Sequence, residues 1–137
     1  MINKILCIED NNIMQNIYRR MIDISDFAEE IIIVNNGEEA LDYYRNLLNL
    51  PENDNRHRFP DVIFLDLNMP VMNGWKFLEE FQALYLHKEL KPSIVVISSS
   101  VDSEDRKRAN KYSVAAFLSK PLTFEILNEL KSRLNHR

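Results

Sequence analysis

The stretch that decides the fold runs from Val62 to Gly74 and reads VIFLDLNMPVMNG. Its first four residues are apolar, and the run ends abruptly at the carboxylate of Asp66, before a segment containing Pro and Gly. A short apolar run of branched and aromatic residues, closed by turn residues, is typical of a fully buried strand. Asp66 is therefore expected where a buried strand leaves the core, the position at which open α/β sheets place their chemistry.

The overall composition is that of one folded domain. The chain has 137 residues, 45% of them hydrophobic and 28% charged, as in ordinary globular proteins. We expect a single domain over residues 1–137, with no output domain after the last helix. The net charge of −4 argues against a nucleic-acid partner, which would require a basic surface. No apolar stretch approaches the roughly 20 residues that cross a bilayer, and the first residues are not those expected of a signal peptide, so we expect a cytoplasmic protein without membrane insertion.

Apolar runs and amphipathic segments alternate along the chain. None of the runs alternates with polar residues, which predicts strands covered on both faces, as in a parallel sheet. Five β-α units with right-handed crossovers predict an α/β fold with a doubly wound parallel sheet. The strands are expected at residues 5–8, 31–34, 62–65, 94–97 and 115–118. The apolar helix faces comprise Met14, Ile17, Tyr18, Met21 and Ile22; Ala40, Leu41, Tyr44, Leu47 and Leu48; Phe77, Leu78, Phe81, Leu84 and Tyr85; and Leu127, Leu130 and Leu134.

Two segments depart from this pattern. The helix expected at about 102–112 is almost wholly polar, with Ala109 its main apolar residue. Its acidic start and basic end suit the helix dipole, but it has little to bury, so it is expected to be the most weakly held of the five helices. Residues 50–60 are polar and contain two prolines, which predicts an exposed loop between the second helix and the third strand.

Polar residues collect at the ends of four of the five predicted strands. Glu9 and Asp10 follow the first strand, Asp66 the third and residues 98–100 the fourth, while Lys120 closes the fifth. In a parallel sheet these ends lie along one edge. Because charged groups meet there from several strands, the sequence predicts a constructed site rather than unrelated surface residues.

The carboxylates of this site require a partner. Two unit charges about 4 Å apart repel by about 4 kcal/mol at an effective dielectric of 20, so either one carboxyl group is protonated or a cation is bound. Oxygen ligands with room for water favour Mg²⁺. A carboxylate beside Mg²⁺ and an ammonium group is suited to attack phosphorus, and phosphoryl transfer depends mainly on positioning and charge neutralisation.

Together these residues resemble the receiver domain of two-component response regulators. The resemblance covers nearly the whole chain and is carried by Glu9-Asp10, the stretch from Asp66 to Gly74, the hydroxyl of Ser98, and Lys120-Pro121. It implies a flavodoxin-like sheet in the order 2-1-3-4-5 with helices on both faces. It also implies a stand-alone receiver, similar to chemotaxis regulators, that acts in a phosphorelay.

The resemblance assigns roles to individual residues. Asp66 would accept a phosphoryl group from a sensor histidine kinase or a histidine phosphotransfer protein, with Ser98 and Lys120 as the other catalytic groups. Mg²⁺ would be held by Glu9, Asp10 and Asp66 and by the backbone carbonyl of Asn68. The Lys120-Pro121 bond would be cis. Catalysis would be limited to the phosphorylation and dephosphorylation of the chain itself.

The resemblance also implies a switch. Ser98 would move toward the phosphoryl group, and Phe117, three residues before Lys120, would change rotamer in response. The surface presented to an unknown downstream protein would consist of the helix at 102–112, the strand at 115–118 and the last helix. The chain is expected to be a monomer or a weak homodimer.

Two other classes of function are compatible with the same fold. A pseudo-receiver would bind proteins without phosphorylation. Such members tend to lose one residue of a set that is complete here: Glu9, Asp10, Asp66, Ser98 and Lys120. A phosphatase or mutase with an aspartyl-phosphate intermediate would resemble its class in carrying a second Asp two positions after the nucleophile, where this chain has Asn68.

Overall fold

The computed structural model describes residues 2–51, 59–68, 72–85, 91–99 and 102–135. Strands and helices alternate along this part of the chain, as predicted. In chain order they are β1 (Lys4–Ile8), α1 (Asn12–Ser25), β2 (Glu30–Val34), α2 (Gly37–Leu48), β3 (Val62–Leu65), α4 (Gly74–Tyr85), β4 (Ser93–Ser98), α5 (Ser103–Asn110), β5 (Ala116–Ser119) and α6 (Phe124–Asn135). No helix among the described residues is long and apolar enough to span a membrane.

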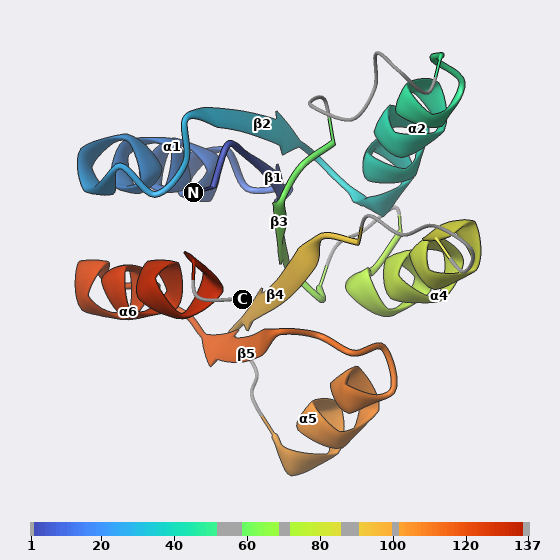
Figure 1. Ribbon diagram of the computed structural model, residues 1–137. Helices are drawn as coiled ribbons and strands as arrows, with labels where there is room; N and C mark the ends of the chain where they lie inside the picture. Colours follow the sequence, from blue (N-terminus) through green and yellow to red (C-terminus); the bar gives the residue numbers. More distant parts are fainter. Residues whose placement is uncertain (1, 52–58, 69–71, 86–90, 100–101, 136–137) are drawn as a thin grey trace.

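The strands form one parallel sheet in the order β2-β1-β3-β4-β5. This is the doubly wound, flavodoxin-like order that the sequence predicted. Figure 1 shows α1 and α6 on one face of the sheet and α2, α4 and α5 on the other. Because β1 and β3 are central, the residues that follow them come together at the carboxyl edge of the sheet, where the order of the strands reverses.

The core has two layers, one on each face of the sheet. Residues of the central strands alternate between the layers, as the strand period of two requires. Phe64 lies in the layer under α1 and α6, beside Tyr18 and Phe27 with ring centroids 6.1 and 5.5 Å away. Its neighbour Ile63 lies in the layer under α2 and α4, with Tyr44. Fully burying a side chain of this size contributes about 1.5–3 kcal/mol, so β3 is held firmly on both faces.

The two edge strands are less covered than the sequence predicted. Residues 31–34 of β2 and Phe117 and Leu118 of β5 are half-buried rather than buried. Both strands have a hydrogen-bonded neighbour on one side only. An edge strand can carry the same apolar sequence as a central one, so the apolar pattern did not reveal which strands lie at the edges.

Helix α1 buries a narrower face than predicted. Tyr18, Met21 and Ile22 are buried, but Ile17 is 41% exposed and lies outside the core. Ile13 and Ile24, on the same helix, are each 70% exposed. Successive helical residues are about 100° apart around the axis, because the helix has 3.6 residues per turn. The prediction that Ile17 shares the buried face was therefore wrong: Tyr18 occupies that face, and Ile17 lies one step around the helix.

The predicted loop at 50–60 is partly packed against the domain. Residues 52–58 lie outside the described residues, so the prediction for them is untested. Phe59, however, stacks on Tyr44 with ring centroids 6.2 Å apart, and Pro60 is buried. The segment is a loop there, as predicted, but the expectation that it is exposed was wrong at its carboxyl end, where Phe59 packs against the core layer that contains Tyr44.

Helix α5 is held by unusual contacts. Ala109 is its one buried residue, and the side chain of Asp102 caps the helix by accepting a 2.7 Å hydrogen bond from the Asp105 amide. The guanidinium carbons of Arg106 and Arg108 lie 5.2 and 4.4 Å from the ring centroids of Phe117 and Trp75. Cation–π contacts at exposed sites are worth about 0.5–1 kcal/mol each, so α5 is fastened by contacts much weaker than a buried apolar face.

We expect α5 to exchange its amide hydrogens faster than α6. Helix α6 buries Leu127 and Leu130, whereas α5 buries only Ala109, and segments with few buried contacts open at low free-energy cost. Native-state hydrogen exchange read by mass spectrometry, with peptides covering each helix, measures this difference. Equal protection of the two helices would show that the arginine contacts replace a buried face.

Candidate functional site

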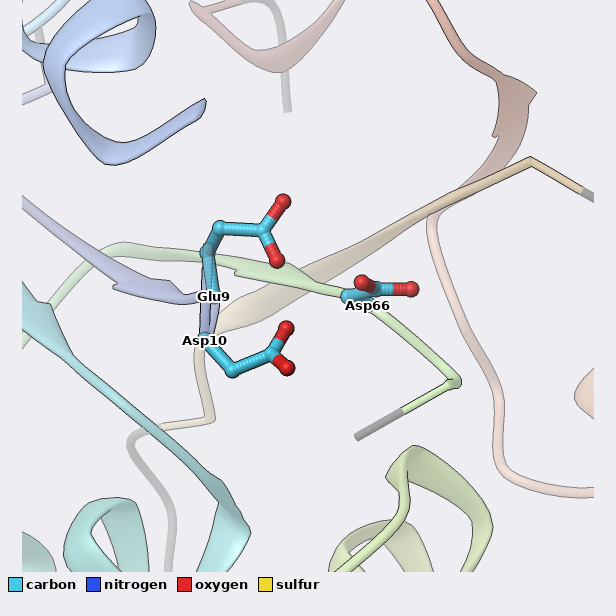
Figure 2. Close-up of side chains that lie close together, drawn as sticks. All are labelled: Glu9, Asp10 and Asp66. Atoms are coloured by element: carbon cyan, nitrogen blue, oxygen red, sulfur yellow. The ribbon is translucent and has the colours of Figure 1, made fainter. Parts of the chain in front are cut away.

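The site forms where β1 and β3 end side by side. Ile8 pairs with Leu65, so the next residues, Glu9 and Asp66, leave the sheet together. The amide of Asp66 still donates a hydrogen bond to the carbonyl of Ile8, 3.3 Å away. Glu9, Asp10 and Asp66 each offer a carboxylate oxygen, and these oxygens lie within 4.8 Å of one another (Figure 2).

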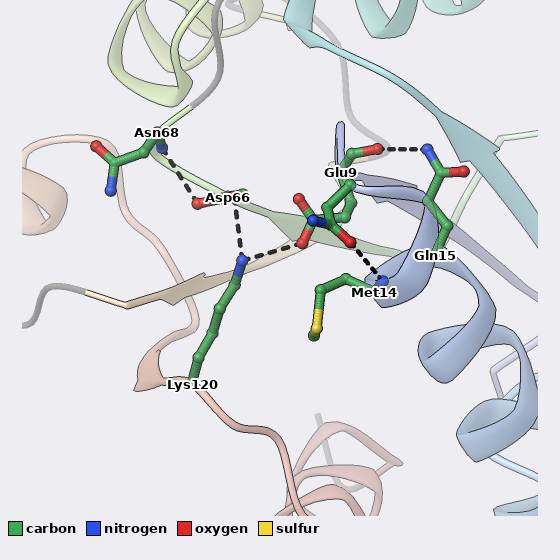
Figure 3. A network of polar contacts seen from close by, with 7 residues as sticks. Glu9, Met14, Gln15, Asp66, Asn68 and Lys120 are labelled. Atoms are coloured by element: carbon green, nitrogen blue, oxygen red, sulfur yellow. Dashed lines mark hydrogen bonds and ion pairs between the residues drawn. The ribbon is translucent and has the colours of Figure 1, made fainter.

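Lys120 reaches this group from the end of the edge strand β5. Its Nζ lies 2.9 Å from Oε1 of Glu9 and 3.2 Å from Oδ2 of Asp66 (Figure 3). The backbone holds Lys120 in place, because its amide donates to the carbonyl of Ser98, 2.9 Å away, at the end of β4. The Lys120-Pro121 peptide bond is cis, as the sequence resemblance implied.

Burial makes the charges of the site costly. The exposed fraction is 1% for Glu9 and 8% for Asp66, whereas Asp10 is exposed. Burial raises the pKa of Glu9, and Lys120 opposes this shift without cancelling it. Burial by itself would lower the pKa of Lys120, but its hydrogen bond to Glu9 and the negative charges of Asp66 and Glu9 outweigh that effect and raise it. The ammonium form of Lys120 is therefore favoured.

The four charged groups fit a divalent cation. Three ionised carboxylates and one ammonium group leave two negative charges in excess. Oε2 of Glu9 is buried and has no hydrogen-bond partner among the described residues, an arrangement that is costly unless a further ligand completes it. Exposed Asp10 leaves one side of the group open to water. Carboxylates together with water are the ligands that Mg²⁺ usually takes, so Glu9, Asp10 and Asp66 form a group able to hold such a metal.

Of the remaining predicted residues, Asn68 adjoins Asp66, whereas Ser98 and Phe117 lie on β4 and β5. The backbone amide of Asn68 donates to Oδ1 of Asp66 across 3.1 Å, so Asn68 directly adjoins the carboxylate. Ser98 is fully buried at the end of β4. Phe117 is half-buried on β5 beneath Arg106, whose Nη1 donates to the Phe117 carbonyl across 3.3 Å. Phe117 packs against the core layer under α2 and α4 and does not belong to the carboxylate group.

Gly74 has a role that its place in a turn did not indicate. It is the first residue of α4, and its amide donates to the carbonyl of Leu67 across 3.0 Å. A Cβ atom at this position would lie 2.7 Å from the backbone oxygen of Asp66 and 2.7 Å from Cα of Leu67. The absence of a side chain at Gly74 thus lets α4 begin directly against the backbone of the site.

Gln15 was also missed, because the sequence did not single it out. Its side-chain amide donates to the backbone carbonyl of Glu9 across 2.6 Å (Figure 3). The available signal was weak: a polar residue six positions after Glu9, in the first turns of the helix that follows the site. Such a position does not tell whether the side chain points to solvent or back toward the strand end.

Comparison with known proteins agrees with this geometry. Residues 5–132 match the response regulator receiver domain. The chain is 32% identical over 123 residues to the probable methanogenesis regulatory protein FilR2 of Methanothrix harundinacea, covering 90% of this chain and 75% of that protein. It spans less than half the length of several other curated relatives.

Solved structures show the same fold over the whole chain. A two-component response regulator from Cytophaga hutchinsonii superposes with a TM-score of 0.85 at 29% identity, covering 99% of this chain and 98% of that one. The phosphorylated cyanobacterial phytochrome response regulator RcpA superposes with a TM-score of 0.73 at 26% identity, covering 99% and 93%. The chain belongs to the response regulator receiver domain family, whose members act in phosphorelay signalling with histidine kinases or phosphotransfer proteins. It is thus a signalling domain and not a classical enzyme.

Proposed function

We propose that Asp66 accepts a phosphoryl group from a phosphohistidine on a histidine kinase or phosphotransfer protein. The observation that carries this proposal is the position of the Asp66 carboxylate, which contacts Lys120 through Oδ2 and lies within a carboxylate group able to hold a metal. An oxygen of Asp66 would attack phosphorus, and the bond between phosphorus and the donor's imidazole nitrogen would break. The electron pair of that bond stays on the imidazole, which leaves in its neutral form when its other ring nitrogen carries a proton and otherwise takes a proton from water.

The surrounding residues would stabilise the transferred group. Lys120 would pair with phosphoryl oxygens, and the hydroxyl of Ser98 would approach them from the end of β4. Glu9, Asp10 and Asp66, with the backbone carbonyl of Asn68, would hold Mg²⁺, which when bound supplies positive charge against the phosphoryl oxygens. Since most of the catalysis is positioning and charge neutralisation, these residues are sufficient without a separate acid or base.

Phosphorylation would act by shifting an equilibrium between conformations of the domain. The element best suited to move is α5, because it buries only Ala109 and is fastened by arginine contacts to Phe117 and Trp75. A change in the Phe117 ring would alter its contact with Arg106 and so the position of α5. The surface of α5, β5 and α6 would then present the phosphorylated state to a downstream protein.

Acetyl phosphate with Mg²⁺ is expected to add one phosphoryl group to the protein, and Asp66→Asn is expected to abolish the addition. Intact-protein mass spectrometry measures the gain in mass. Asp61→Asn is the matched control, since Asp61 is an exposed aspartate at the opposite end of β3, and it should be modified like the wild type. An undiminished gain in Asp66→Asn contradicts the proposal. A wild type that is never modified supports the pseudo-receiver alternative instead.

A further inference from the structure

Gln15 lies beside the site and joins it to two other elements. Its Nε2 lies 2.6 Å from the backbone carbonyl of Glu9 and 2.9 Å from Oδ1 of Asn35. The amide of Gln15 thus donates to the end of β1 on one side and to the turn after β2 on the other. The side chain is half-buried, and its hydrogen bond to Glu9 is partly shielded from water, whereas its hydrogen bond to Asn35 is exposed to solvent.

The network continues into α2. Nδ2 of Asn35 lies 3.1 Å from Oε1 of Glu39, and the backbone amide of Asn35 donates to the same oxygen across 3.0 Å. Glu39 is in the first turn of α2, where a carboxylate is favoured by the helix dipole. Because the carboxylate of Glu39 accepts from the Nδ2 group of Asn35, the Asn35 carbonyl oxygen is left facing Gln15. These contacts fix which group donates and which accepts in each hydrogen bond from Gln15 through Asn35 to Glu39.

The carbonyl that Gln15 contacts belongs to the peptide bond between two site residues. The last hydrogen bond that joins this end of β1 to β2 runs from the Glu9 amide to the Val34 carbonyl, 3.1 Å away. After Glu9 the backbone leaves the sheet, and the Glu9 carbonyl accepts a hydrogen bond from the Gln15 side chain instead of from a neighbouring strand. Asp10, on the far side of this peptide bond, makes no side-chain hydrogen bond or ion pair to another described residue. Its direction therefore depends on how the peptide is held.

We propose that Gln15 is a positioning residue for the divalent cation site. By fixing the Glu9–Asp10 peptide, it keeps the Asp10 carboxylate aimed at those of Glu9 and Asp66, with which it lies within 4.8 Å. The inference rests on the cation site of the proposed function and adds a residue to it. Groups that orient ligands from outside the ligand shell commonly change metal affinity by about 10- to 100-fold when they are removed.

Gln15→Met tests this role, because Met keeps the length of the side chain and removes its donor. The matched control is Gln82→Met, the same substitution at an exposed position of α4. We expect the Kd for Mg²⁺, measured by isothermal titration calorimetry with Mg²⁺ alone, to rise about tenfold in Gln15→Met and to stay within twofold of the wild type in Gln82→Met. Phosphorylation by acetyl phosphate should need more Mg²⁺ for half its maximal rate, while the rate at saturating Mg²⁺ changes less than twofold.

A second variant covers the case in which Gln15→Met does not fold. Asn35→Ala leaves Gln15 in place but removes the group that orients it, and we expect the Kd for Mg²⁺ to rise about threefold. Wild-type affinity in the folded variants would overturn the inference and leave the proposed function intact. A wild type that binds no Mg²⁺ would instead contradict the cation site itself. A fall in the saturated rate with unchanged affinity would also overturn the positioning role.

Discussion

Replacing Lys120 with Met is expected to lower the free energy of unfolding by about 3 kcal/mol at neutral pH. The Lys120 side chain is 20% exposed and lies 2.9 Å from Glu9, whose side chain is 1% exposed. Removing one partner of a buried ion pair leaves the other charge without compensation, which is commonly worth about 3–5 kcal/mol. The lower end applies here, because Lys120 retains some contact with water. Equilibrium unfolding in urea measures the loss.

The loss should depend on pH in a defined direction. Burial already raises the pKa of Glu9, and removing Lys120 raises it further. A carboxyl group whose pKa is higher in the folded state than in the unfolded state destabilises the fold progressively as the pH rises through the folded pKa. The difference between Lys120→Met and the wild type should therefore be smallest in acidic solution and grow as the pH rises and Glu9 loses its proton.

Mg²⁺ should partly reverse the defect. In the wild type the ammonium group of Lys120 shares Glu9 and Asp66 with any cation bound there, so the variant is expected to be stabilised more by added Mg²⁺ than the wild type. Binding to the folded state alone raises stability with the concentration of the ligand. Phosphorylation should still be lost, because no ammonium group is left to pair with phosphoryl oxygens.

Lys76→Met is the control for this prediction. Lys76 pairs with Glu79 and Glu80 on the surface of α4, and its side chain is 52% exposed. Exposed pairs of this kind contribute about 0–1 kcal/mol, so Lys76→Met should unfold almost like the wild type. If Lys120→Met were equally stable, the contacts of Lys120 with the buried carboxylates would have no energetic weight.

Central strands and their ends could be predicted because they have strong local signals. A buried strand needs an unbroken apolar run, and the change to Glu9 or Asp66 marks where it leaves the core. The sheet order follows from the resemblance, and the structure confirms it. The exposure of Ile17 and the partial cover of β2 could not be predicted, because they depend on which neighbours pack there and an isoleucine has the same side chain in either place.

The contacts that hold the site together were harder to predict than the charged groups in it. Glu9, Asp66 and Lys120 are ionisable groups at strand ends, so their chemistry drew attention to them. Gln15 and Gly74 carry no charge, and their roles depend on distances to backbone atoms of Glu9 and Asp66. Such backbone contacts are set by the angle at which α1 and α4 leave the sheet, and hydrophobic periodicity does not specify that angle.

Gly74→Ala is expected to lower the free energy of unfolding by about 2–3 kcal/mol, in the upper part of the range for overpacking. The new Cβ would lie 2.7 Å from the Asp66 carbonyl oxygen and 2.7 Å from Cα of Leu67. Both are backbone atoms at the end of the most buried strand, so relief requires α4 to shift or the segment after β3 to bend. Chemical denaturation measures the stability, and calorimetry with Mg²⁺ measures the accompanying loss of affinity at Asp66.

Gly37→Ala separates this effect from a general cost of replacing glycine. Gly37 also begins a helix, and neither glycine has a positive φ, so Ala is compatible with the backbone at both positions. The new Cβ at Gly37 would meet no backbone atom: it would lie 3.0 Å from Cβ of Phe77, a contact that needs a shift of a few tenths of an ångström, and 3.1 Å from the flexible chain of Met72, which can move aside. The loss of free energy of unfolding in Gly37→Ala should stay below about 1 kcal/mol, since the helix preference of Ala partly offsets it, and the affinity for Mg²⁺ should be unchanged.

Equal effects of the two substitutions would mean that the approach of α4 to the Asp66 backbone does not hold the site in shape. A larger effect at Gly74 on both stability and metal affinity would show that the site depends on where α4 begins.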